Sequence, residues 1–176
     1  MIELSYDAAS PGLPPDDILA AMREAALAAI GERGVDDAEI SLSFVSPSEI
    51  RALNGEHRGA YEVTDVLSFP MDGAGEGEAA PRMADGGDTD AAAPRTPDDE
   101  DTDAAVPRPP LLLGDIVICP ERARGQAAEY GHGEPREFVY LFVHGLFHLL
   151  GYDHGTEEAR AEMRAAEEKV MRRVNL

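Results

Sequence analysis

The stretch EPREFVYLFVHGLFHLLGYDH, residues 134–154, predicts a buried helix that carries two histidines and a following loop that carries a third. It is apolar on nearly every side, which is typical of a helix that runs through a protein core. His144 and His148 are four residues apart, so their side chains lie on the same helix face. Gly151 can end the helix in a left-handed conformation and bring His154 back toward them.

Three imidazoles at this spacing predict a metal site. Three protein ligands leave a fourth position open for water, as in catalytic rather than structural zinc sites. The alternative is that the histidines are unrelated, two on a buried helix and one in a loop. The chain has five histidines in all, and three of them lie within eleven residues at ligand spacing. We therefore predict one zinc ion per chain, bound by His144, His148 and His154.

The histidine spacing also matches the metzincin protease motif H-E-x-x-H-x-x-G-x-x-H, apart from its second residue. In those proteases the glutamate is the general base that activates the metal-bound water. Gly145 occupies that position here and has no side chain to do this. The pattern indicates a metal-dependent hydrolase, and the missing glutamate argues against peptide cleavage by the metzincin route.

Composition and charge set further limits. The chain has 176 residues, enough for one domain with a substantial core. We expect no secretory signal, because the N-terminus has neither a basic region nor an apolar stretch, and no membrane span. A single cysteine, Cys119, fits a cytoplasmic location. The net charge of −20 is unfavourable for binding nucleic acid, because phosphate binding depends on lysine and arginine.

Much of the negative charge is concentrated between the expected third and fourth strands. Residues 72–106 contain eleven acidic and two basic residues and are mostly Ala, Gly, Pro and Asp. Such a segment buries too little apolar surface to offset its ordering entropy. We predict one domain over residues 1–176, interrupted by a disordered acidic insertion at residues 72–110.

Hydrophobic periodicity and helix-capping residues predict the remaining elements. Alternating or continuous apolar residues indicate four strands, the last of them central and covered on both faces. A capping box at Ser46 predicts a short helix that ends near Asn54. These elements predict an α+β fold, a small mixed four-stranded sheet packed with about five helices. The strands are expected near residues 2–6, 40–44, 66–69 and 115–119, and the helices begin near residues 16, 47, 120, 134 and 157.

A second group of polar residues precedes the third strand. Arg58 is expected in a glycine-flanked loop between the short helix and that strand. Its guanidinium is always charged and offers a planar fork of donors to phosphate oxygens. Taken alone, an arginine in a loop is more often a solvated charge.

Three motifs together resemble those of the YbeY family of bacterial ribosomal RNA maturation factors. They are H-G-x-x-H-L-x-G-Y-D-H at residues 144–154, N-x-x-x-R-x-x-x-x-x-T-D-V-L-S-F at residues 54–69, and L-G-D-I-x-I at residues 113–118. The resemblance covers nearly the whole chain except residues 72–110. It implies a metal-dependent endoribonuclease with zinc on the three histidines and an arginine, Arg58, needed for activity. It also implies a mixed sheet with surrounding helices, a cytoplasmic location, and action on single-stranded RNA, notably the 3′ end of small-subunit ribosomal RNA. The spacing shared with the metzincins makes the metal helix zincin-like.

The expected mechanism leaves the general base open. We expect Arg58 to stabilise the charge that develops on the phosphate. Asp153 is the nearest carboxylate in sequence and is a candidate either for the base or for a group that orients a histidine. If Arg58 and the metal form a local positive cleft in an acidic protein, bare RNA should bind weakly. Specificity would then come from the ribosomal subunit or ribosome-associated proteins.

Two other functions share these features. A metalloprotease-like hydrolase would use the same histidines, although Gly145 and the segment at residues 64–69 argue against it. A non-catalytic, zinc-containing ribosome assembly factor fits the sequence nearly as well.

Overall fold

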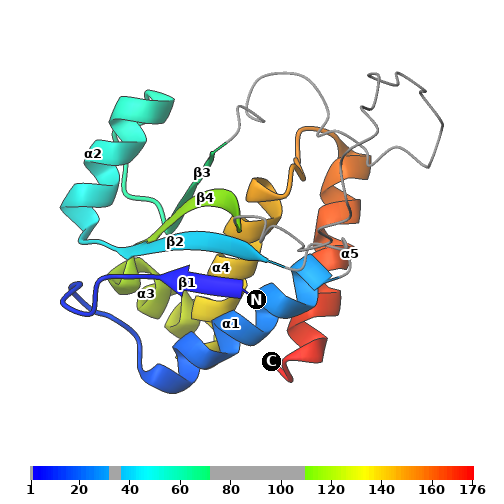
Figure 1. Ribbon diagram of the computed structural model, residues 1–176. Coiled ribbons are helices and arrows are strands. Elements are labelled where there is room, and N and C mark those ends of the chain that lie inside the picture. Colours follow the sequence, from blue (N-terminus) through cyan, green and yellow to red (C-terminus); the bar gives the residue numbers. More distant parts are fainter. Residues whose placement is uncertain (1, 32–36, 72–109) are drawn as a thin grey trace, which may run out of the picture.

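A computed structural model describes residues 2–31, 37–71 and 110–176, and in these ranges four strands form one sheet with five helices around it (Figure 1). The predicted α+β fold is therefore confirmed. In chain order the elements are β1 (Ile2–Ser5), α1 (Asp16–Gly31), β2 (Ala38–Phe44), α2 (Pro47–Arg58), β3 (Val66–Pro70), β4 (Leu111–Ile118), α3 (Pro120–Tyr130), α4 (Glu134–Leu149) and α5 (Glu157–Arg173).

The sheet is mixed, with the strand order β1-β2-β4-β3. β1 and β4 both run parallel to β2, and β3 runs antiparallel to β4. The prediction that β4 is an internal strand is confirmed, although it begins at Leu111, earlier than its apolar core suggested. Its side chains alternate between two apolar clusters. Ile116 and Ile118 pack in the larger cluster, and Val117 packs in the smaller one.

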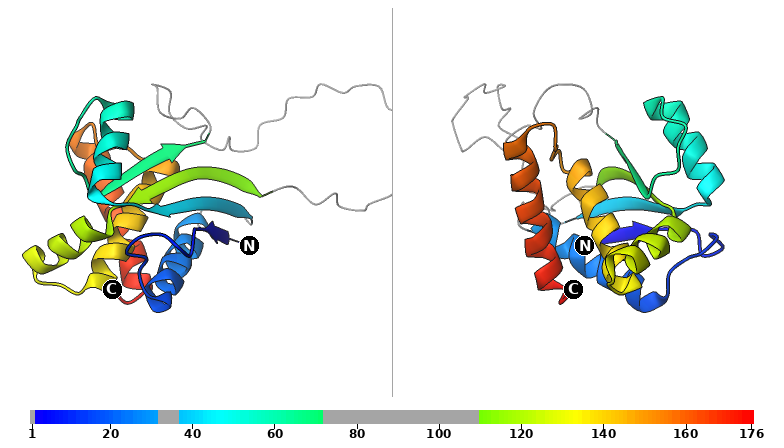
Figure 2. Two further views of the ribbon diagram at one scale, coloured as in Figure 1. Left: turned by 90° about the vertical axis from the view of Figure 1, so that its left-hand side faces the viewer. Right: turned by 180° about the vertical axis from the view of Figure 1, so that it is seen from behind.

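Helices cover both faces of this sheet, but unequally. The larger apolar cluster joins one face to α1, α4 and α5, and α2 packs on the other face (Figure 2). α4 lies at the centre, with Phe138, Phe142 and Leu146 fully buried. The helix that carries His144 and His148 is thus held by packing along most of its length, as its all-round apolar sequence predicted.

The course of α2 differs from the prediction. Ser46 begins it with a capping box, as expected, since its side chain accepts from the Glu49 N–H and Glu49 accepts from the Ser46 N–H. The helix does not end near Asn54, however, but continues to Arg58. Gly55 therefore lies within the helix, where a side chain would collide with the ring of Tyr61. The expectation that Arg58 lies in a loop was wrong, because the glycine that ends the helix is the next one, Gly59 (φ 71°).

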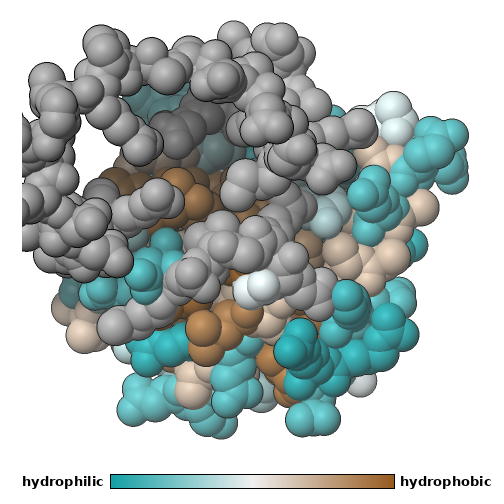
Figure 3. Space-filling view, turned by 45° about the vertical axis from the view of Figure 1, so that its right-hand side comes forward, coloured by the Kyte–Doolittle hydropathy of each residue, from teal (hydrophilic) through white to brown (hydrophobic). Residues whose placement is uncertain are grey.

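Two expectations concern the surface and the remainder of the chain. In the described ranges no helix is long and apolar enough to cross a membrane. On the face drawn in Figure 3, hydrophilic residues are widespread and hydrophobic residues lie between them. The predicted acidic insertion, residues 72–110, falls almost entirely outside the described residues, so its predicted disorder and the single-domain assignment stay predictions.

Candidate active site

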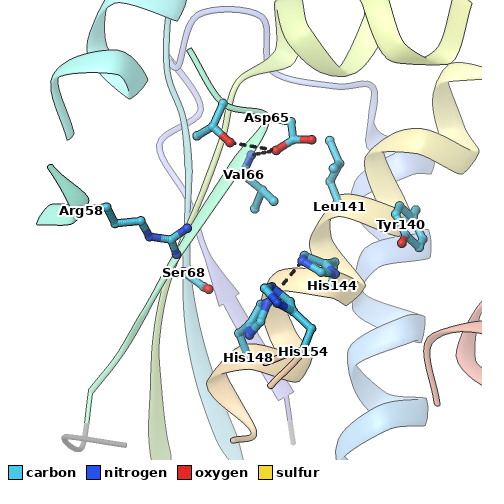
Figure 4. A pocket seen from close by; sticks show the side chains of 10 residues that line it. Arg58, Asp65, Val66, Ser68, Tyr140, Leu141, His144, His148 and His154 are labelled. Carbon is cyan, nitrogen blue, oxygen red and sulfur yellow. Dashed lines mark hydrogen bonds between the residues drawn. The ribbon is translucent and has the colours of Figure 1, made fainter. Parts of the chain in front are cut away.

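A pocket of about 290 Å³ lies between α2, β3 and α4 and contains four of the residues predicted from the sequence (Figure 4). His144 and His148 enter it from α4, His154 from the loop after α4, and Arg58 from the last turn of α2. Segments that are far apart in the sequence therefore meet at one place. The full lining is Arg58, Thr64, Asp65, Val66, Ser68, Tyr140, Leu141, His144, His148 and His154.

The three histidines form a tight cluster. Each offers one ring nitrogen, and these nitrogens all lie within 4.8 Å of one another. The Nε2 atoms of His144 and His148 are 3.2 Å apart. Two nitrogens that each lie about 2.0–2.1 Å from one tetrahedral zinc ion are separated by about 3.3 Å, so this spacing suits a shared ion.

The turn after α4 brings His154 to the cluster. Gly151 has φ 83°, and its N–H donates to the His148 carbonyl, while the Tyr152 N–H donates to the Phe147 carbonyl. These two bonds form a Schellman cap, and the Phe147 and Tyr152 rings complete it with centroids 4.9 Å apart. The left-handed glycine predicted at this position is confirmed.

Hydrogen bonds orient both helical histidines with Nδ1 as the donor. His144 Nδ1 donates to Glu167 Oε1 at 2.7 Å, and His148 Nδ1 donates to the Tyr152 carbonyl at 3.1 Å. Each neutral ring then has its lone pair on Nε2, the atom that faces the cluster. Glu167 is buried on α5 and also accepts from the Tyr140 hydroxyl at 3.4 Å. The donor set therefore fits a metal ion that prefers imidazole.

The electrostatic surroundings favour a neutral His148 and a protonated Tyr140 hydroxyl. Burial, together with the neighbouring His144 and His154, lowers the pKa of His148 and favours its neutral form, which is the form that binds metals. Burial and the charge of Glu167 raise the pKa of Tyr140 to about 12, so its hydroxyl stays protonated and remains a donor to that carboxylate.

Arg58 approaches the histidines from the opposite wall of the pocket (Figure 4). It is exposed and forms no ion pair with the described residues, so its guanidinium is available to a ligand. A cation and three metal-type nitrogens facing one space are suited to an anionic group such as a phosphodiester.

Comparisons with known proteins identify the family of this chain. A family model described as "Endoribonuclease YbeY" matches residues 11–175. The chain belongs to the YbeY family.

Individual YbeY relatives match over most of their length. A Bacillus licheniformis protein named endoribonuclease YbeY is 40% identical over 166 residues, which are 94% of this chain and 90% of that protein. One from Caldanaerobacter subterraneus subsp. tengcongensis is 49% identical over 145 residues, 82% of this chain and 79% of that protein. The solution structure of TM1509 from Thermotoga maritima shares the fold, with a TM-score of 0.53, 21% identity, and coverage of 98% of this chain and 91% of that one.

The structure also shows where Asp153 and Gly145 lie, two residues that neighbour the histidines in the sequence. The Asp153 carboxylate is exposed and accepts from the His154 N–H at 2.7 Å, and it does not line the pocket. Gly145 faces the sheet, where an added Cβ would lie 3.1 Å from Ile116 Cγ2. A glutamate at position 145 would collide with β4, so glycine at this position allows α4 to pack closely on the sheet.

Two carboxylates near the histidines were not predicted from the sequence. Glu167 lies on the buried face of α5, with Met163 and Val170. An acidic residue among apolar ones on a helix face is rarely buried without a partner, so its position in the sequence indicated a polar contact. Asp65 lines the pocket and accepts from the Val66 N–H and the Gln126 amide, both at 2.8 Å. Burial alone would raise the pKa of Asp65, but these hydrogen bonds outweigh it and hold the pKa below its ordinary value. Asp65 is therefore a fixed negative charge in the pocket.

A smaller pocket of about 180 Å³ adjoins the histidines on the α5 side. It is lined by Arg160 and Arg164, one helical turn apart, as well as by His144 and His154. Neither arginine forms an ion pair within the described ranges. Two further cations, which were not predicted from the sequence, thus lie on the α5 side of the histidines, in a lining that also contains Glu167.

Proposed function

We propose that this protein is a metal-dependent endoribonuclease that cleaves single-stranded RNA during ribosomal RNA maturation, at the 3′ end of small-subunit RNA. The observation that carries the proposal is the pocket in which three histidine nitrogens face the guanidinium of Arg58. The activity named for the YbeY relatives supports the same conclusion. The resemblance to the YbeY family, from which we infer the substrate, also implies that the protein acts in the cytoplasm and on the ribosomal subunit.

In this proposal His144, His148 and His154 hold one zinc ion. Zinc held by three imidazoles supplies Lewis-acid polarisation and activates water near neutral pH. Glu167 and the Tyr152 carbonyl keep the two helical imidazoles in the tautomer that presents Nε2.

Arg58 has the role of binding the scissile phosphate. It donates to the non-bridging oxygens and stabilises the extra negative charge that they acquire in the transition state. Its place at the end of α2, where Gly59 stops the helix, holds the guanidinium opposite the histidines. Asp65 lies on the same lining and stays ionised, so its charge repels a phosphate and confines it to the side of Arg58 and the histidines.

The proposal is tested by measuring zinc content and RNA cleavage for four full-length proteins. The wild type should bind one zinc ion per chain and cut single-stranded ribosomal RNA. His148→Ala should lose both zinc and cleavage. Arg58→Ala should keep zinc and lose cleavage by about 100-fold, because it removes one stabilising charge from the transition state. Arg23→Ala, which replaces an exposed arginine of α1 outside the pocket, is the matched control and should behave as the wild type.

The same experiment separates the competing functions. Cutting that survives His148→Ala would refute the assignment of the site. A zinc-loaded wild type that binds RNA or ribosomal subunits without cutting would instead be an assembly factor. An unfolded protein substrate is included, and its cleavage would indicate a peptidase.

A further inference from the structure

A second pocket, of about 450 Å³, adjoins the histidine pocket on the side of α3. The two share Asp65, Tyr140 and Leu141, so a ligand that extends from one reaches the other. Its lining is Asp65, Gln126, Tyr130, His132, Arg136, Glu137, Tyr140 and Leu141. Its lining includes neither the three histidines nor Arg58.

The rim of this second pocket is aromatic and exposed. Tyr130, the last residue of α3, is 67% exposed, and its ring lies 6.0 Å from that of His132. Tyr140 is 38% exposed on the opposite side, toward the histidines. Arg136 is exposed and forms no ion pair with the described residues. Exposed rings and a free guanidinium are the groups on which unpaired bases stack.

The interior of the second pocket is rich in hydrogen-bond acceptors. Glu137 is buried, and its Oε2 lies 3.1 Å from His132 Nε2. The Asp65 carboxylate accepts a hydrogen bond from the Gln126 amide at 2.8 Å. Gln126 is 9% exposed, and its Oε1 has no hydrogen-bond partner among the described residues. A buried acceptor without a partner needs a physical reason, and a donor supplied by a ligand is one.

The charge of this lining is unfavourable for a phosphate. Two carboxylates, Asp65 and Glu137, stand against the single permanent cation Arg136. A phosphate would be repelled, whereas the amino and ring N–H groups of a nucleobase are donors that match these acceptors. The face of the same base would lie against the exposed rings.

We propose that the second pocket binds an unpaired base of the RNA strand, next to the nucleotide whose phosphate meets Arg58. Tyr130 and Arg136 stack on the base, and the acceptors around Gln126 and Glu137 bind its edge. This inference rests on the proposed function, because it assumes that RNA occupies the histidine pocket. It explains how an acidic protein holds a single strand, since stacking adds affinity that does not depend on phosphate charge.

The test is a scan with short single-stranded RNAs in which one position at a time is abasic. Cleavage by the zinc-loaded protein is measured as kcat/KM. Equilibrium binding is measured separately with His148→Ala, which keeps the second pocket. One abasic position should weaken both by about tenfold, the size expected for loss of one stacked base. Tyr130→Ala should cause a loss of similar size on intact RNA and no further loss at that abasic position.

Two matched variants check that the effect is specific to stacking. Tyr130→Phe retains the ring and should behave as the wild type. Tyr6→Ala removes an exposed tyrosine that follows β1, at the far edge of the sheet, and should also have no effect.

The outcomes distinguish this inference from the proposed function. If Tyr130→Ala lowered affinity and kcat/KM by the same factor on every abasic RNA as on intact RNA, or did not lower them at all, the base-binding pocket would be refuted. The proposed endoribonuclease activity would be unaffected by that result. If the wild type did not cut RNA, the proposed function would fail. The binding scan would still decide whether a base occupies the pocket.

Discussion

Replacing Glu167 should weaken metal binding without altering the three histidines. Glu167 Oε1 lies 2.7 Å from His144 Nδ1, and the carboxylate is almost completely buried. A hydrogen bond to such a charged group contributes about 1.5–3 kcal/mol. Because 1.36 kcal/mol corresponds to a factor of ten, removing it should weaken zinc binding by about 10- to 100-fold, the range found for groups that orient metal ligands.

A graded series makes this prediction sharper. Glu167→Ala removes the acceptor and should fall near the 100-fold end of that range. Glu167→Gln keeps a neutral acceptor, and because charged hydrogen bonds are roughly twice as strong as neutral ones, its loss should be closer to tenfold. Glu168→Gln changes the exposed neighbour on the same helix and should leave the affinity unchanged.

Zinc affinity is measured at pH 7 by competition with a chelator of known affinity. Circular dichroism checks that each variant is folded. A Glu167→Ala protein that is folded and binds zinc as tightly as the wild type would refute the reasoning, because His144 would then need no partner to orient it. A loss of equal size in Glu168→Gln would assign the effect to net charge.

Three further predictions concern packing, pH and salt. Gly145→Glu should lower the free energy of unfolding by about 1–3 kcal/mol or more, measured in urea, and create no peptidase activity, because its Cβ would lie 3.1 Å from Ile116 Cγ2. Asp65 has a lowered pKa in the folded protein, so it contributes stability above its unfolded-state pKa near 4 that is lost as the pH falls. Asp65→Asn should therefore be less stable than the wild type at pH 7, and the difference should shrink as the pH falls from 4 to 2. Arg164→Gln should weaken binding to all single-stranded RNAs and reduce the slope of log affinity against log salt by about 0.7, whereas Arg23→Gln should change neither.

The parts of the site that follow from local geometry could be predicted from the sequence. The four-residue spacing of His144 and His148 places them on one face of any helix, and Gly151 ends that helix in a conformation that glycine adopts readily. The strands and the capping box at Ser46 follow from equally short patterns. The end of α2 was mispredicted because Gly55 resembles a helix stop, and only its contact with Tyr61 explains why glycine is needed within the helix.

What surrounds the histidines was decided by the tertiary structure alone. The fold class, the metal helix and the turn that returns His154 follow from the sequence, because each depends on residues a few positions apart. The packing of α2 and α5 around α4 brings Arg58 to face the histidines and Glu167 to accept from His144. These contacts join residues separated by long stretches of chain, and their geometry depends on how whole elements pack on the sheet, which no local pattern of residues specifies.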